Sequence, residues 1–113
     1  MKMTIEQALA RLPGPATARY PQGAPSVELM RHGTMVLKVY APQGKDIQTP
    51  HTQDELYFVI DGRGTFVNGA ERVAFEPGDC LFVAAGVEHR FVDFTPDFKT
   101  WVVFWGPEGG EAA

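Results

Sequence analysis

Apolar and polar residues alternate in short runs along most of the chain, a pattern that indicates β-strands rather than helices. The candidate strands are residues 26–31, 35–40, 56–61, 64–67, 71–75, 81–84, 89–94 and 99–105. Asn68-Gly69 is a strong signal for a tight hairpin between two of these runs. Pro77-Gly78-Asp79 marks a further turn. Many short strands separated by turns predict a β-sandwich or a β-barrel.

The N-terminal segment has a helical pattern instead. Four apolar residues recur there at helical spacing: Ile5, Ala8, Leu9 and Leu12. Thr4 can cap the helix at its start, and Pro13-Gly14-Pro15 ends it. We therefore expect one domain over residues 1–113, with a helix at about 4–12 that packs on a barrel core at about 18–105. Residues 106–113 are rich in Gly, Glu and Ala, and we expect them to form a flexible tail.

The run 56–61 is apolar on both of its faces. Leu56, Phe58 and Ile60 lie opposite Tyr57 and Val59. A strand with one solvated face would alternate apolar and polar residues, so we expect both faces to be covered. The core covers one face, and another sheet, the N-terminal segment or a second subunit covers the other. The last run is also aromatic, with Trp101 and Trp105 expected in the core or at a subunit interface, and together these features predict a homodimer.

Composition narrows the class of protein. The chain of 113 residues is 44% hydrophobic, which suits a globular core and excludes the usual disordered compositions. The net charge of -4, without a basic cluster, argues against nucleic-acid binding, and no apolar run is long enough for a membrane helix. The N-terminus has no apolar signal region, and the single cysteine, Cys80, cannot form an internal disulfide. We therefore expect a cytoplasmic protein, with Cys80 as a small buried hydrophobic residue.

Candidate chemistry is concentrated just before and within the run 56–61. If the chain is extended there, five alternate residues share one face: His51, Gln53, Glu55, Tyr57 and Val59. Polar groups on a buried face cost free energy unless each has a partner, and a metal ion is one such partner. His89 follows a second glycine-punctuated stretch, and we expect the fold to bring it to His51 and Glu55. His32 lies in a predicted turn and is expected to be solvated, as are Asp54 and Glu88.

These spacings resemble the two motifs of the cupin superfamily, which consists of small β-barrels of jelly-roll type. The first motif has two histidines one residue apart, then a glutamate after a gap of three or four residues, and then a glycine after a gap of six more. Glu55 and Gly62 match its last two positions, and His51 matches the second histidine. Thr49 stands at the position of the first histidine, so the motif is incomplete here.

The second motif of that family is matched in register by Gly78, Gly86 and His89. Ala84 stands at its proline and Asp93 at its asparagine. The resemblance covers about residues 43–93. It implies an all-β, cupin-like jelly-roll barrel, here with a short N-terminal helix.

His51, Glu55 and His89 would form a set of two histidines and one carboxylate. That set suits non-haem iron(II) with open positions, and it also suits zinc, manganese or nickel. We therefore expect one divalent metal ion of open identity, with Thr49 and Gln53 as additional candidate ligands. The alternative is that the three side chains hydrogen-bond one another in a polar pocket without metal.

The resemblance implies enzymes such as dioxygenases, isomerases and lyases that act on small polar organic molecules. Tyr57 is the candidate catalytic acid or base, although a core aromatic residue whose hydroxyl finds one partner is the favoured interpretation. Thr49 and Ala84 depart from the motifs and favour an alternative, a non-catalytic cupin that binds a small ligand such as a sugar. A third possibility is a structural barrel whose polar pocket has lost its function.

Overall fold

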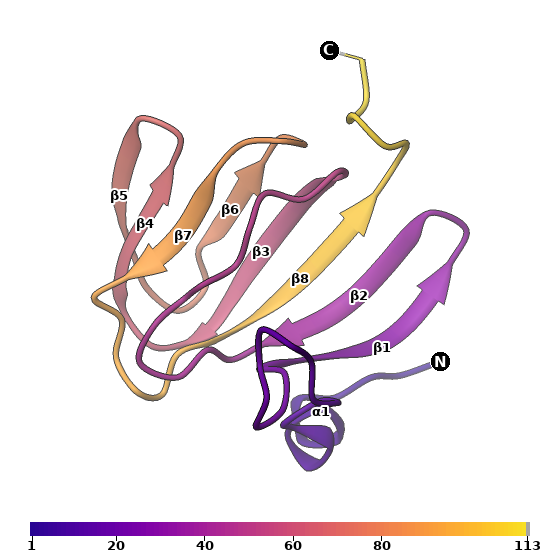
Figure 1. Cartoon of the computed structure of the whole chain (residues 1–113), viewed down its shortest axis with the longest axis vertical. Coiled ribbons are helices and arrows are strands. Elements are labelled where there is room, and N and C mark those ends of the chain that lie inside the picture. The colour runs from indigo at the N-terminus through magenta and orange to yellow at the C-terminus, as the bar shows by residue number, and fades with distance from the viewer. Residues whose placement is uncertain (113) are drawn as a thin grey trace.

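The computed structural model describes residues 1–112 and places eight strands in two antiparallel sheets (Figure 1). The elements are α1 (Ile5–Arg11), β1 (Ser26–His32), β2 (Met35–Tyr40), β3 (Asp54–Asp61), β4 (Gly64–Asn68), β5 (Glu71–Phe75), β6 (Cys80–Val83), β7 (His89–Val92) and β8 (Lys99–Trp105). Each run predicted from the sequence corresponds to a strand, with ends that differ by at most two residues. The predicted all-β fold with a short N-terminal helix is confirmed.

The larger sheet has the order β1-β2-β8-β3-β6, and the smaller sheet has the order β5-β4-β7. The two sheets lie opposite each other (Figure 1), and their inner faces enclose an aromatic core. The rings of Phe91 and Phe98 have centroids 4.5 Å apart, and Phe75 packs edge-on at 5.3 Å from Phe91. The core extends to His89, whose ring centroid lies 6.2 Å from that of Phe66. The polar site is therefore built directly onto the hydrophobic core.

Helix α1 covers one part of the outer face of the larger sheet. Thr4 and Gln7 form a reciprocal capping box at its start, which satisfies backbone donors that the first turn leaves free. Ala8 is fully buried against Val27 and Val39, which confirms the predicted packing of the helix on the barrel. Among the described residues, no helix is long and apolar enough to cross a membrane.

The rest of that outer face is apolar and open to solvent. Phe58 on β3 is 41% exposed and Phe82 on β6 is 52% exposed. Neither the smaller sheet nor α1 covers Phe58, so a second subunit remains the predicted cover. Cys80 is exposed as well, so the expectation that it is buried is wrong. The reason is that β6 is the edge strand and Cys80 pairs with Phe58 on the outer face.

Gly62 ends β3 at a close approach between two backbone segments. Its φ is +93°, and a Cβ atom there would overlap the backbone of Phe98. Glycine is the residue that tolerates both conditions, because it has no Cβ and adopts positive φ at little cost. The spacing between Glu55 and Gly62 therefore has a packing reason that is independent of any ligand.

The segment between β2 and β3 crosses in front of the sheets (Figure 1) and is held by a buried carboxylate. Asp46 accepts hydrogen bonds from the Tyr40 hydroxyl, from the backbone N–H of Phe91 at 2.8 Å and from the Gln48 side chain at 2.7 Å. These bonds tie the segment to both sheets and fix the course of the chain toward His51. The sequence predicted only a polar loop here.

We predict that Asp46→Asn lowers the free energy of unfolding by about 2–4 kcal/mol, because the amide nitrogen cannot accept the bonds that one carboxylate oxygen accepts. Urea denaturation at neutral pH measures the loss. Asp93→Asn is the matched control, because Asp93 is exposed and its positive φ of 52° suits asparagine. Equal unfolding midpoints for the Asp46 variant and the wild type would show that this carboxylate does not hold the loop.

Candidate metal centre

Three side chains from separate parts of the chain meet inside the barrel. Glu55 comes from β3, His89 comes from β7 of the other sheet, and His51 comes from the segment before β3. Glu55 Oε1 lies 2.7 Å from His89 Nε2, and Glu55 Oε2 lies 3.2 Å from His51 Nδ1. The candidate ligand atoms all lie within 4.8 Å of one another. The fold thus brings together the residues that the sequence analysis groups.

Hydrogen bonds from the turn before β7 set the position of His51. The backbone N–H of Gly86 donates to the carbonyl of His51 at 2.8 Å, and Gly86 adopts a φ of +80°. The neighbouring N–H of Ala85 donates to the Asp54 carboxylate at 2.9 Å. The turn that leads to His89 therefore also holds the segment that carries His51, so that both histidines share one support.

Asp54 is buried, so the expectation that it lies on the surface is wrong. Its second carboxylate oxygen accepts from the backbone N–H of Glu111 at 2.9 Å, and Gly109 donates to the carbonyl of Thr52 at 2.7 Å. The chain after β8 is thereby attached to the segment next to the site. The flexibility of residues 106–113 stays a prediction, with residue 113 outside the described part of the chain.

The surroundings of His89 determine which of its ring nitrogens carries hydrogen. Nδ1 lies 2.8 Å from the carbonyl oxygen of Val87, which can only accept, so Nδ1 is the protonated nitrogen. Nε2 therefore presents its lone pair to Glu55 when the ring is neutral. A histidine whose Nδ1–H is bound to a carbonyl and whose Nε2 faces a carboxylate has the orientation typical of a metal ligand.

Polar atoms at the centre of the cluster lack hydrogen-bond partners of good geometry. They are His51 Nδ1 and both carboxylate oxygens of Glu55, all buried. The contacts of Glu55 with the two histidines are short, but they are not aligned as hydrogen bonds. Buried, unsatisfied lone pairs are costly, and a cation between them would satisfy all three atoms. The residues present therefore fit a metal ion.

The electrostatics favour an ionised carboxylate. Burial opposes ionisation of Glu55, but the contacts with His51 and His89 outweigh it and lower the pKa of Glu55 to about 2. Burial likewise opposes protonation of His89, yet the nearby Glu55 carboxylate raises the pKa of His89. Glu55 is therefore ionised at neutral pH, and its carboxylate is available as an anionic ligand.

Tyr57 connects this centre to the buried loop. Its hydroxyl donates to Gln48 Oε1 at 3.1 Å and lies 3.1 Å from His89 Nε2. Burial and the Glu55 charge raise the pKa of Tyr57 well above its usual value, so the hydroxyl keeps its proton. Gln48 in turn donates to Asp46. Sequence reasoning missed Asp46 and Gln48, because isolated polar residues in a loop produce no periodic signal.

The two additional candidate ligands have other hydrogen-bond partners. The hydroxyl of Thr49 accepts from Arg19 at 3.3 Å, and the Gln53 amide donates to the carbonyls of Gly106 at 2.8 Å and Thr34 at 3.3 Å. The shared face was conditional on an extended chain, and that condition is not met before Asp54, where β3 begins. Within β3, Glu55, Tyr57 and Val59 do lie on one buried face. Ligation of a metal by Thr49 or Gln53 stays a prediction.

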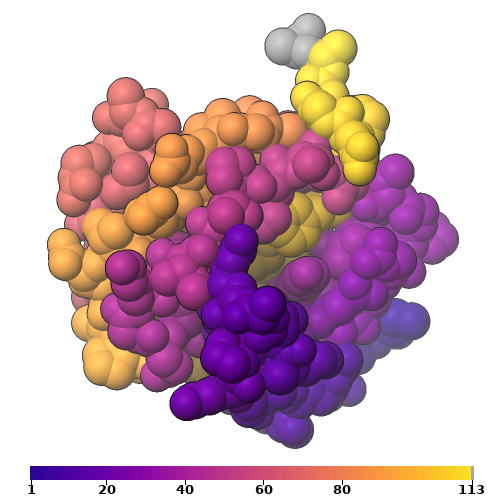
Figure 2. All heavy atoms as spheres, in the orientation of Figure 1, coloured from indigo at the N-terminus to yellow at the C-terminus, as the bar shows by residue number. Residues whose placement is uncertain are grey.

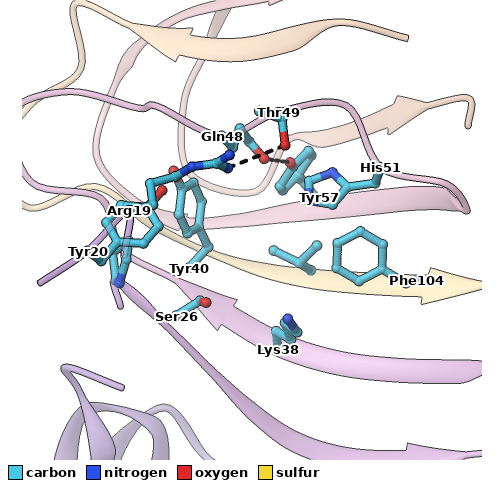
Figure 3. Close-up of a pocket in the computed structure, with 12 residues that line it drawn as sticks. Arg19, Tyr20, Ser26, Lys38, Tyr40, Gln48, Thr49, His51, Tyr57 and Phe104 are labelled. Atoms are coloured by element: carbon cyan, nitrogen blue, oxygen red, sulfur yellow. Dashed lines mark hydrogen bonds between the residues drawn. The ribbon is translucent and has the colours of Figure 1, made fainter. Parts of the chain in front are cut away.

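A cavity of about 140 Å³ opens beside His51 and Tyr57 (Figure 3). Other residues that line it are Arg19, Lys38, Tyr40, Gln48, Thr49 and Phe104. The Phe104 ring packs against His51, with centroids 4.8 Å apart. In the space-filling view (Figure 2) a hollow lies between the indigo N-terminal segment and the neighbouring magenta and purple segments. The proposed centre therefore has a route to solvent along one side.

Comparisons with known proteins agree with this architecture. A family model described as "Cupin domain" matches residues 36–99. An uncharacterised protein of Streptomyces coelicolor is 37% identical over 84 residues, which cover 73% of this chain and 80% of that protein. An acireductone dioxygenase of Prochlorococcus marinus is 41% identical over 64 residues, which cover 52% of this chain but only 35% of that protein.

A solved structure, a cupin 2 conserved barrel domain protein from Salinispora arenicola, aligns with a TM-score of 0.56 and 25% identity. The alignment covers 72% of this chain and 74% of that one. Together with the two antiparallel sheets, this likeness confirms the jelly-roll barrel that the motif spacing implied.

We predict that Tyr57 and Gln48 are energetically coupled. Tyr57→Phe should lower the free energy of unfolding by about 1 kcal/mol, because the Gln48 carbonyl loses its donor in a buried place. A double-mutant cycle with Gln48→Leu, measured by urea denaturation, isolates the pair and should give a coupling of about 0.5–1 kcal/mol. Strictly additive losses would contradict the hydrogen bond as a contributor to stability.

Proposed function

The chain belongs to the cupin family, and on that premise we propose that it binds one divalent metal ion through His51, Glu55 and His89. The observation that supports this proposal is the set of buried, unpartnered atoms between the two sheets. Ligands that each lie about 2.1 Å from a common ion are roughly 3 Å apart, which is close to the distances of Glu55 Oε1 from His89 Nε2, 2.7 Å, and of Glu55 Oε2 from His51 Nδ1, 3.2 Å. The full ligand set spans up to 4.8 Å, so a bound ion would draw its side chains slightly together.

The donor set leaves the identity of the metal open among iron, zinc, manganese and nickel. Two histidines and one carboxylate with open positions are typical of iron(II) in oxygenases. When bound, such an ion would polarise a substrate oxygen or activate dioxygen. The similarity to acireductone dioxygenase favours the second chemistry, although the matched region spans about a third of that protein.

We further propose that the protein is an enzyme of dioxygenase, isomerase or lyase type that acts on a small polar organic molecule in the cavity beside His51. Tyr57 is the candidate catalytic acid or base, because its hydroxyl lies next to His89 and the residue lines the cavity. Its raised pKa keeps the hydroxyl protonated, so it would act on a bound substrate chiefly as a hydrogen-bond donor. Phe104 packs on His51, with ring centroids 4.8 Å apart, and would help to hold the imidazole in place. Gln48 orients the Tyr57 hydroxyl.

A second candidate function is non-catalytic binding of a small ligand such as a sugar. One observation favours it: the position of the first motif histidine is held by Thr49, and its hydroxyl is engaged with Arg19. With three protein ligands instead of four, the metal site would be weaker or absent. In that case the cavity would serve for recognition alone.

We predict about one equivalent of metal per chain in the purified or reconstituted protein, because three protein ligands are sufficient for a catalytic site. His51→Ala should lose most of this metal as measured by elemental mass spectrometry. His32→Ala is the matched control and should retain it, since His32 is exposed at the end of β1. Absence of metal from the wild type, even after reconstitution, would refute the metal proposal and favour ligand binding alone.

We also propose that two copies of the chain associate through the outer face of the larger sheet. Phe58 and Phe82 are exposed there, and Trp105 lies beside Phe82 with ring centroids 6.3 Å apart. Strand β3 contributes Leu56 next to Val103 of β8, so the apolar surface is continuous across three strands. A single patch of this kind can pair with itself about a two-fold axis.

For this interface we predict that light scattering gives twice the chain mass of 12.4 kDa for the wild type. Phe58→Lys should shift the mass to that of one chain, because a charge in the centre of an apolar interface is desolvated without a partner. Val73→Lys, at an equally exposed valine on the other sheet, should remain dimeric. A wild-type mass of one chain at working concentration would exclude the dimer.

A further inference from the structure

Two cationic side chains border the cavity beside His51, and the proposed metal chemistry does not account for them. Lys38 comes from β2, and Arg19 comes from the segment between α1 and β1. Figure 3 shows Arg19 reaching across the cavity toward Thr49 and Lys38 lying below Phe104. No Asp or Glu is among the described residues that line the cavity. Its charged lining is therefore positive.

Lys38 lies on the inner face of β2, at a position where alternation along the strand predicts a core residue. On β2 the inward positions are Val36, Lys38 and Tyr40, and the two flanking residues are buried. Lysine is rarely placed among buried residues, because its ammonium group loses hydration there. Lys38 avoids that cost because it is half-buried and lines the cavity, and its Nζ lies 5.8 Å from the centroid of the Phe104 ring.

Neither cation is neutralised within the described chain. The ion pairs of residues 1–112 do not include Lys38 or Arg19. Glu28 lies opposite Lys38 in the register of β1 and β2. The carboxylate of Glu28 forms its ion pair with Arg31 instead, at 2.7 Å. Arg19 is exposed and Lys38 is half-buried, so an anion that enters the cavity would meet two cations with no competing carboxylate in its lining.

Arg19 has N–H donors that are not used by its hydrogen bond to Thr49. One of its Nη atoms donates to the Thr49 hydroxyl at 3.3 Å, and a guanidinium group has five N–H donors in a planar fork. That fork matches the two oxygens of a carboxylate, while the lysine ammonium supplies a compact charge. The hydrogen bond to Thr49 holds the guanidinium at the cavity wall. Thr49 thus has a role at the site other than metal ligation.

We propose that the cavity binds the carboxylate of a small organic acid, with Lys38 and Arg19 as the binding residues. This inference rests on the proposed function only in that the other end of the same molecule would face the metal centre at His51. The cavity of about 140 Å³ is well below the size of a typical drug-sized pocket, so the acid has few carbon atoms. The two cations disfavour neutral analogues relative to the acid, because an uncharged isostere forms no charge-assisted hydrogen bond with either of them.

The test is calorimetric titration of the full chain with malonate, with its neutral diamide malonamide, and with inorganic phosphate. Malonate should bind, and Lys38→Met should weaken its binding by about tenfold or more, as expected for the loss of one charge-assisted contact. Lys45→Met is the matched control, since Lys45 is exposed and does not line this cavity, and it should bind malonate like the wild type. Malonamide should show no binding.

A second pair of variants tests the site independently, in case Lys38→Met weakens binding by impairing folding. Arg19→Gln should also weaken malonate binding, whereas Arg72→Gln, at an exposed position on β5, should not. Equal binding of malonate and malonamide, or unchanged binding in both cavity variants, would overturn the inference. Tighter binding of phosphate than of malonate would overturn the assignment to a carboxylate.

Metal content measured on the same samples separates this inference from the proposed metal function. If chelator-stripped protein and His51→Ala still bind malonate in a Lys38-dependent way, the anion site stands whether or not a metal is present. If malonate binding requires metal and is indifferent to Lys38 and Arg19, the ligand is held by the metal alone. The anion site is then refuted while the metal site stands.

Discussion

A buried carboxylate must be compensated, and the arrangement of this barrel around Glu55 follows from that requirement. Glu55 is 0% exposed between two sheets, where an uncompensated charge would be prohibitively costly. His89 reaches it from β7 of the smaller sheet, and His51 reaches it from the segment before β3. The site is therefore also a point at which the two sheets are joined.

The chain contains a second buried carboxylate that is compensated in a different way. The oxygens of Asp46 accept hydrogen bonds from Tyr40, Phe91 and Gln48, so that residue is satisfied by the protein alone. The oxygens of Glu55 have close neighbours but no well-aligned donors. The Asp46 carboxylate is thus fully hydrogen-bonded within the protein, whereas the Glu55 carboxylate lacks well-aligned hydrogen-bond donors. This contrast is the physical basis for placing a ligand at Glu55 and none at Asp46.

The two faces of the larger sheet differ in chemical character. Its inner face is mainly apolar, with the buried Thr100, the site around Glu55 and the cavity-lining Lys38 among its polar positions. Its outer face is apolar and is covered by α1 only near Val39, which leaves Phe58 and Phe82 exposed. The residues on the two faces depend on one strand register, because side chains alternate along a strand. A shift of one residue in β3 would turn Glu55 outward and Phe58 inward. The register of β3 therefore positions the proposed metal centre and the proposed dimer surface together.

The sequence by itself determined the strands, the helix and the grouping of His51, Glu55 and His89. Alternation, turn residues and motif spacing are local properties, so they can be read before the chain is folded. It did not predict the roles of Asp46, Gln48, Arg19 or Lys38, because each depends on partners distant along the chain. It also misjudged Asp54 and Cys80: backbone donors from Ala85 and Glu111 bury the first, and an edge strand exposes the second. Only the tertiary structure decided these points, because burial and hydrogen-bond satisfaction are set by which segments the packing of the two sheets brings together.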